Sequence, residues 1–203
     1  MLTIWLVRHG ETDSNARGVF QGQLDVPLNQ RGEEQARIVS ARLASERLDA
    51  VYASDLQRAA RTAEIVAASH GLPVTLDRDL RERHYGTLQG ETYERAGELL
   101  SMLGLSSAGE GGIGSATLPG GETLVALRRR ACSFAQRMAD AHPIDGGQAV
   151  LIVSHGGLLR VLLTVLLHLP ASARQRFAFG NCGISRVTQR ERSAVLEFHN
   201  LLG

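Results

Sequence analysis

Lysine is absent from this sequence of 203 residues, so all 22 basic side chains are arginines. This absence excludes an active-site lysine and the lysine of a Walker-type phosphate loop. The arginines are nearly balanced by 21 acidic residues, which leaves a formal net charge of +1. Because so small a charge creates no overall field toward nucleic acid or an anionic membrane, we expect neither as a partner.

Cysteine and long apolar runs are also scarce. Cys132 and Cys182 are the only cysteines and lack CxxC spacing, so we expect no disulfide framework or zinc site and two reduced, structural thiols. The longest apolar run, residues 158–169, is interrupted by Arg160 and is too short to cross a bilayer. No basic segment precedes the first apolar run, and we therefore expect a cytoplasmic protein.

The sequence does contain an alternation of apolar strand-like runs and amphipathic helical patterns. Strands are predicted at 3–7, 48–53, 73–76, 149–154, 183–189 and 194–199, and helices at 29–46, 56–70, 122–142 and 156–168. Ser54 or Asp55 is expected to cap the second of these helices. This order predicts an α/β fold, a three-layer sandwich in which helices flank a mostly parallel central sheet.

Two segments are predicted to be irregular. Residues 13–28 are polar and contain glycine, which is typical of a loop over the end of the first strand. Residues 101–121 hold seven glycines and many other small side chains, as a flexible linker or lid does. We therefore predict one domain over residues 1–203, with residues 80–121 as a cap or lid insertion.

Two histidines occupy equivalent places in the pattern. His9 and His155 each follow an apolar strand and precede a glycine, so both can lie at one edge of the sheet. A single histidine after a strand is often only a polar residue at the end of that strand. The same pattern occurs twice here, once beside Arg8, and this favours a functional site. Arg8 and Arg58 offer planar donors that match phosphate oxygens, and a guanidinium next to His9 opposes a metal cation. We therefore expect an anion site without a metal.

These residue types suit phosphoryl transfer. A phosphate held by two arginines can be attacked by an imidazole to give a phosphohistidine, and the departing alkoxide then needs a proton. Glu82 is the candidate acid, although it could instead be a surface carboxylate paired with Arg81 or Arg83. Most other arginines, such as those at 128–130, are predicted to lie on solvated helix faces. A serine hydrolase is not indicated, since the sequence has no Gly-x-Ser-x-Gly turn.

The motif Arg8-His9-Gly10-Glu11-Thr12, with Asn15 six positions after the histidine, resembles the catalytic motif of the histidine phosphatase superfamily, also called phosphoglycerate-mutase-like. Residues 21–22, 25–28, 54–59, 80–86 and 153–157 continue the resemblance over nearly the whole length. It implies that His9 is the phosphorylated nucleophile, that Arg8, Arg58 and His155 hold the phosphoryl group, and that Glu82 is the proton donor. The residues expected to bind substrate are Asn15, Gln21, Gly22, Tyr85 and Gly156.

The resemblance favours the phosphatase branch. We expect a metal-independent and cofactor-free phosphomonoesterase that acts on a small phosphorylated metabolite, such as a sugar phosphate. The alternatives are a cofactor-dependent phosphoglycerate mutase and a non-catalytic protein that binds a phosphorylated ligand. A mutase must hold a substrate carboxylate, yet no Arg, Lys or His lies between Arg95 and Arg128. Arg17 or Arg83 could replace such a contact. The sequence predicts neither the individual substrate nor the oligomeric state.

Overall fold

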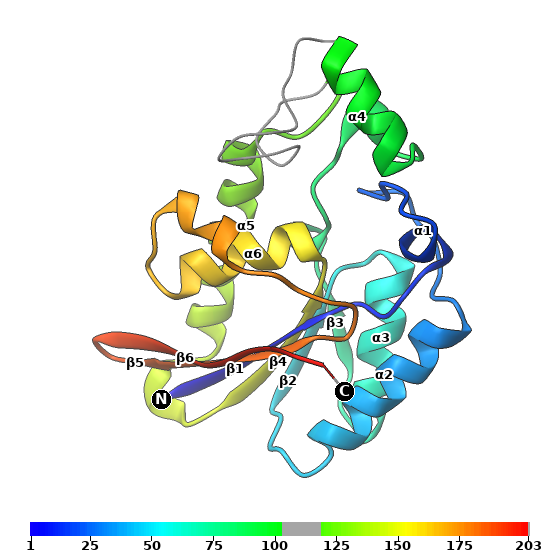
Figure 1. The fold of residues 1–203 in the computed structure, drawn as a ribbon. Helices are drawn as coiled ribbons and strands as arrows, with labels where there is room; N and C mark the ends of the chain where they lie inside the picture. The colour runs from blue at the N-terminus through cyan, green and yellow to red at the C-terminus, as the bar shows by residue number, and fades with distance from the viewer. Residues whose placement is uncertain (103–118, 203) are drawn as a thin grey trace.

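The computed structural model describes residues 1–102 and 119–202 (Figure 1). Its centre is a six-stranded sheet with the order β3-β2-β4-β1-β5-β6. Strands β1 to β4 pair in parallel, while β5 and β6 form an antiparallel hairpin at one edge. The strands are β1 (Leu2–Arg8), β2 (Ala50–Ala53), β3 (Val74–Leu76), β4 (Ala149–Ser154), β5 (Ile184–Arg190) and β6 (Ser193–Leu201).

Helices cover both faces of this sheet (Figure 1). Alternate side chains of β1 point to opposite faces: Ile4 and Leu6 pack with α5 and α6, and Trp5 and Val7 pack with α2 and α3. The predicted α/β sandwich with a mostly parallel sheet is confirmed. The α-helices are α1 (Asp13–Ala16), α2 (Gln30–Leu43), α3 (Gln57–Ala68), α4 (Tyr93–Met102), α5 (Leu124–Ala141) and α6 (Gly156–Leu166). The 3₁₀ turns are Arg78–Leu80, Gly86–Leu88, Ile144–Gly146 and Ala171–Arg176.

Two local predictions were wrong. The segment after β1 is not all loop, because Asp13–Ala16 forms α1. A reciprocal capping box starts this helix: the Thr12 hydroxyl accepts from the Asn15 N–H, and the Asn15 side chain accepts from the Thr12 N–H. Neither Ser54 nor Asp55 caps α3. That helix begins after Leu56, and the Gln57 N–H donates instead to the Asp25 carboxylate at 2.7 Å.

Residues that follow β3 build a small separate cluster. Leu88, Ala96 and Leu100 are buried together, apart from the two cores that face the sheet. An isolated bridge between Val19 and Thr92 joins the start of α4 to the segment after α1. Residues 103–118, which make up most of the predicted lid segment 101–121, lie outside the described residues. The cap or lid therefore stays a prediction, and so does the single-domain boundary.

Two smaller observations concern cysteine and membranes. Both cysteines are free thiols; Cys182 is buried, as a structural thiol would be, whereas Cys132 is exposed. Within the described parts of the chain, every helix is too short or too polar to cross a bilayer.

Candidate active site

The two histidines meet where β1 and β4 end. These strands are neighbours in parallel register, with Arg8 beside Ser154, so the residues that follow them emerge at the same sheet edge. The His9 N–H still donates to the Ser154 carbonyl, at 2.9 Å. The imidazole rings of His9 and His155 lie with their centroids 5.0 Å apart, and both residues are buried. The structure thus brings together two groups that the sequence separates widely.

The His9 ring is held in one tautomer. Its Nδ1 lies 2.7 Å from the Gly10 carbonyl, and a carbonyl oxygen can only accept, so Nδ1 carries the proton and Nε2 carries the lone pair. Burial, and secondarily the charges of Arg58 and Arg8, lower the pKa of His9 well below its usual range. His9 is therefore a neutral imidazole at neutral pH, which is the form that can act as a nucleophile.

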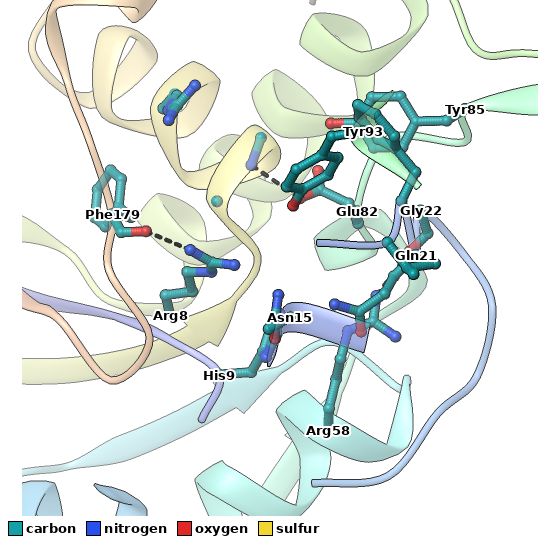
Figure 2. A pocket seen from close by; sticks show the side chains of 15 residues that line it. Arg8, His9, Asn15, Gln21, Gly22, Arg58, Glu82, Tyr85, Tyr93 and Phe179 are labelled. Carbon is teal, nitrogen blue, oxygen red and sulfur yellow. Dashed lines mark hydrogen bonds between the residues drawn. The ribbon is translucent and has the colours of Figure 1, made fainter. Parts of the chain in front are cut away.

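Arg8 and Arg58 are fixed by backbone carbonyls. Arg8 Nη1 donates to the Phe179 carbonyl at 2.7 Å (Figure 2). Arg58 donates through Nη1 and Nη2 to the carbonyls of Leu24 and Gly22, each at 2.7 Å. Burial lowers the pKa of Arg8, and it lowers the pKa of Arg58 to about 10, so both stay charged at neutral pH. The Nε–H of each is buried without a partner among the described residues.

His155 adds further unpartnered polar atoms. Both of its ring nitrogens are buried and have no hydrogen-bond partner among the described residues. Burial, then the charges of Arg58 and its other cationic neighbours, lower the pKa of His155 well below its usual range. A buried donor without an acceptor costs about 1 to 3 kcal/mol. A bound anion would accept from these groups and remove that cost, so the cluster fits a phosphoryl group.

Glu82 is held at the amino end of α6. One carboxylate oxygen accepts from the Arg83 and Leu158 N–H groups at 2.7 and 3.1 Å. The other accepts from the Gly157 N–H at 2.9 Å, and Figure 2 shows this carboxylate at the edge of the cavity. A Cβ added to Gly157 would overlap the first of these oxygens, so this approach requires glycine. The alternative pairing of Glu82 with Arg81 is not what the structure shows, because Arg81 pairs with Asp55 instead.

A cavity of about 200 Å³ joins these groups. It is lined by nine of the ten predicted site residues: Arg8, His9, Asn15, Gln21, Gly22, Arg58, Glu82, Tyr85 and Gly156. The tenth, His155, is fully buried, with its ring next to that of His9. Nine of the ten residues predicted for the site thus share one cavity, and their catalytic and binding roles stay predictions.

Some lining residues escaped the sequence analysis. Phe20, Tyr85 and Tyr93 form an aromatic wall in which Phe20 packs edge-on to the two tyrosines, at centroid distances of 5.3 and 4.7 Å. Only Tyr85 was predicted, since the other two come from segments with no recognisable motif. Arg160 also lines the cavity. Its signal was visible, because it interrupts an apolar helix, but it was read only as a break in a hydrophobic run.

One predicted surface arginine is not at the surface. Arg130 pairs with Glu122 at 2.7 Å, and each of these side chains is only 14% exposed. It also donates to the backbone carbonyls of Asp79, Arg81 and Glu82. The prediction of a solvated face is therefore wrong for this residue. Helical periodicity could not reveal its role, because its acceptors lie about fifty positions earlier in the chain.

The structure also bears on the choice between an anion and a metal. Within residues 1–102 and 119–202, no three His, Cys, Asp or Glu side chains gather closely enough to hold a metal ion. The cavity instead places guanidinium groups and the His9 imidazole beside one carboxylate. Fold and cavity together define a class, namely an α/β protein with an arginine-lined cavity beside a buried histidine at the sheet edge.

Comparison with known families identifies that class. The family model of the histidine phosphatase superfamily (branch 1) matches residues 4–202, so the chain belongs to this family. "Probable phosphoglycerate mutase GpmB" of Salmonella choleraesuis (strain SC-B67) is 38% identical over 196 residues, which cover 94% of this chain and 86% of that protein.

Two solved structures show the same fold over nearly the whole chain. Mycobacterial glucosyl-3-phosphoglycerate phosphatase, in complex with VO3, aligns with a TM-score of 0.85 and 28% identity, covering 98% of each chain. Alpha-ribazole phosphatase from Shigella flexneri aligns with a TM-score of 0.86 and 28% identity, covering 99% of this chain and 98% of that one.

Proposed function

We propose that this chain is a metal-independent phosphomonoesterase that acts on a small phosphorylated metabolite through a phosphohistidine on His9. The observation that carries the proposal is the arrangement around Nε2 of His9. A neutral imidazole with a free lone pair shares one cavity with two guanidinium groups whose Nε–H donors are unpartnered among the described residues. Glu82 lines the same cavity and can meet the leaving group.

The proposed reaction has two steps. His9 Nε2 attacks phosphorus, the bond to the ester oxygen breaks, and a protonated Glu82 gives its proton to that oxygen, so that an alcohol leaves. Water then attacks the phosphohistidine while the Glu82 carboxylate takes one of its protons. Inorganic phosphate departs and both side chains are regenerated. Arg8, Arg58 and His155 hold the phosphoryl oxygens throughout and stabilise their charge.

Size and family support a small substrate. The cavity of about 200 Å³ is smaller than the roughly 300 to 1,000 Å³ of sites that take drug-sized ligands. The two structural relatives named above are phosphatases of small phosphorylated compounds, whereas the Salmonella relative carries the name of a mutase. Transfer to a second hydroxyl is therefore the competing function, and it uses the same phosphohistidine.

The covalent intermediate is the direct test. Enzyme mixed with a radiolabelled aryl phosphate and quenched in alkali should carry a label that is stable to alkali, labile to acid, and located on His9 by peptide mapping. His9→Asn should carry no label and should lose at least about a thousandfold in kcat, since a nucleophile has no substitute. His168→Asn is the matched control. His168 is exposed and has a φ of 55°, which asparagine tolerates.

Two outcomes would contradict the proposal. The first is a label on another residue, and the second is turnover by His9→Asn near that of the unmodified enzyme. A chelator should change neither labelling nor turnover, because arginines supply the positive charge. Loss of activity with a chelator, restored by one divalent ion, would assign the protein to a different class of phosphatase.

A further inference from the structure

Arg160 is the one charged residue of α6, whose sequence is otherwise apolar or small. Nearly all of this helix is buried against the sheet and α5, as Leu158, Leu159, Leu162 and Leu163 show. Arg160 lies four positions after Gly156 and three after Gly157, which places the three residues on one face of the helix. All three line the cavity beside His9. The helix therefore presents a single cation to the site and otherwise packs in the core.

The Arg160 guanidinium has no carboxylate to pair with. No hydrogen bond or ion pair joins it to any residue in the described parts of the chain, whereas Arg81 and Arg130 each bind a carboxylate closely. Its charge acts on two cations, Arg8 and Arg174, and on the Tyr85 phenol. The charge of Arg160 adds to burial in lowering the pKa of both Arg8 and Arg174. Like charges close together repel, so this region gains free energy when an anion lies among them.

The side chains that line the cavity carry more positive than negative charge. The charged side chains among its described lining residues are Arg8, Arg58 and Arg160 against Glu82. A phosphomonoester brings a charge of about −1.5 to −2 at neutral pH, which Arg8 and Arg58 can match. Glu82 is uncharged when it acts as the proton donor. One positive charge, that of Arg160, then remains without a counterpart at the wall of a small cavity.

We infer that Arg160 binds a second anionic group of the substrate, so that the site selects small phosphomonoesters that also carry a carboxylate or a second phosphate. This inference rests on the proposed function and names its substrate class. The guanidinium fork suits either group, because both present paired oxygens. Arg160 is then a specificity-determining residue, while the phosphoryl group itself is held by Arg8 and Arg58.

Glycerol 3-phosphate and 3-phosphoglycerate form a matched pair of probes, because the first carries a hydroxymethyl group where the second carries a carboxylate. Glycerol 1,3-bisphosphate tests the second phosphate. Each Kd is measured by calorimetry on His9→Asn, which cannot turn the probes over, and on the same variant carrying Arg160→Gln. Arg129→Gln, on an exposed part of α5, is the matched control.

The expected result is selective. His9→Asn should bind at least one anionic probe about tenfold or more tightly than glycerol 3-phosphate, because a charge-assisted bond is worth that much. Arg160→Gln should abolish this preference and leave the Kd for glycerol 3-phosphate unchanged, whereas Arg129→Gln should change nothing. Which probe is preferred distinguishes the carboxylate from the second phosphate. In the active enzyme, Arg160→Gln should raise KM for the preferred probe and spare kcat.

Two results would overturn the inference. One is an absence of any preference for the anionic probes. The other is an equal loss for all three probes in Arg160→Gln, which would assign Arg160 a general electrostatic or structural role. Because these measurements are equilibrium binding, they stand apart from the covalent test. An enzyme that fails to label His9 yet shows the Arg160-dependent preference would refute the proposed hydrolysis and keep the second anion site.

Discussion

At the scale of single residues, the two buried histidines couple the site to the stability of the fold. Burial holds the pKa values of His9 and His155 well below the usual range near 6.5. In the unfolded chain both would titrate near that value. As pH falls below about 6.5, the two histidines bind protons in the unfolded state but stay neutral in the folded state, so the free energy of unfolding must decrease. Above that pH the two histidines no longer make stability depend on pH.

Urea unfolding at pH 7.5, 6.5 and 5.5, in a buffer without phosphate, measures this effect. Each histidine should contribute a slope approaching about 1.4 kcal/mol per pH unit below pH 6. The double variant His9→Asn, His155→Asn should therefore lose stability less steeply on acidification than the unmodified chain. Inorganic phosphate should stabilise the unmodified chain, because it binds only the folded state. Parallel pH profiles for the two chains would show that these histidines titrate alike when folded and unfolded.

The candidate site was more predictable than the contacts that hold it. His9 and His155 could be paired from sequence because parallel strands emerge at one edge, and Arg8 adjoins the first of them. Arg130 was missed because its acceptors lie in another segment, and Arg160 was missed because most of the cavity that it lines is formed by other segments. An arginine on a helix usually lies in solvent, and nothing local to Arg130 indicates that it reaches residues 79–82.

At the scale of elements, the segment that carries Glu82 depends on α5. Arg130 projects from this helix and donates to three carbonyls of residues 79–82, while Glu122 holds the same guanidinium from the other side. Gln23 adds a bond from its side-chain amide to the Glu82 carbonyl at 3.0 Å. The segment makes no regular secondary structure beyond one 3₁₀ turn, so these side-chain bonds help to place the Glu82 backbone, from which the carboxylate reaches the Gly157 and Leu158 N–H groups.

Arg130→Gln should therefore impair the step in which Glu82 donates a proton. The loss of kcat/KM should be large with an alkyl phosphate, whose leaving group needs the proton, and small with an activated aryl phosphate. Glu82→Gln should show the same selectivity more strongly. Because Arg130→Gln leaves the Glu122 carboxylate without its buried partner, this variant should also lose about 3 kcal/mol of unfolding free energy.

The leaving-group comparison separates positioning from mere stability. A variant that is only destabilised would lose activity equally with both substrates at a temperature where it is folded. Arg129→Gln, the neighbouring residue on the exposed side of α5, should behave as the unmodified enzyme in both assays. If Arg130→Gln lost kcat/KM equally with the two substrates, Arg130 would not position Glu82 for proton donation.

Helices and strands with a long periodic pattern were predicted correctly. The predictions failed for the short helix α1 and for the start of α3, where hydrogen bonds at the helix ends decide the structure. The four-residue α1 is too short to show a periodic pattern, and its capping box uses asparagine where glutamate or glutamine is usual. The start of α3 is held by Asp25, from a segment that local sequence rules cannot place beside it. The antiparallel edge of the sheet could be expected from the closely spaced runs of β5 and β6.

At the scale of the whole molecule, the question is whether the phosphohistidine is hydrolysed or passed to another hydroxyl. The 38% identical relative named as a mutase makes this a real choice. Transfer requires that water be kept from the phosphohistidine, since exclusion of water suppresses hydrolysis of a reactive intermediate. It also requires that a bisphosphate remain bound while it turns around. Both demands fall on residues that surround the cavity on the side away from His9.

Cations suited to that task are few here. No Arg, Lys or His lies between Arg95 and Arg128 in the sequence, a stretch that carries Glu98, Glu110 and Glu122. Arg160 supplies one cation from the rigid helix α6, and its side chain is exposed to solvent. One solvent-exposed guanidinium can select an anionic substrate, but it does not exclude water from the cavity. We therefore expect hydrolysis to exceed transfer.

The deciding assay supplies 3-phosphoglycerate with a catalytic amount of 2,3-bisphosphoglycerate and follows 2-phosphoglycerate and inorganic phosphate together. Phosphate release should be at least about tenfold faster than interconversion, which corresponds to a difference of about 1.4 kcal/mol between the two barriers. With 3-phosphoglycerate below its KM, Arg160→Gln should lower both rates in proportion if both start from the same bound substrate. Interconversion faster than phosphate release would establish a mutase. In that case water would have to be excluded by groups other than Arg160, and the two arginines and two histidines would still hold the phosphoryl group.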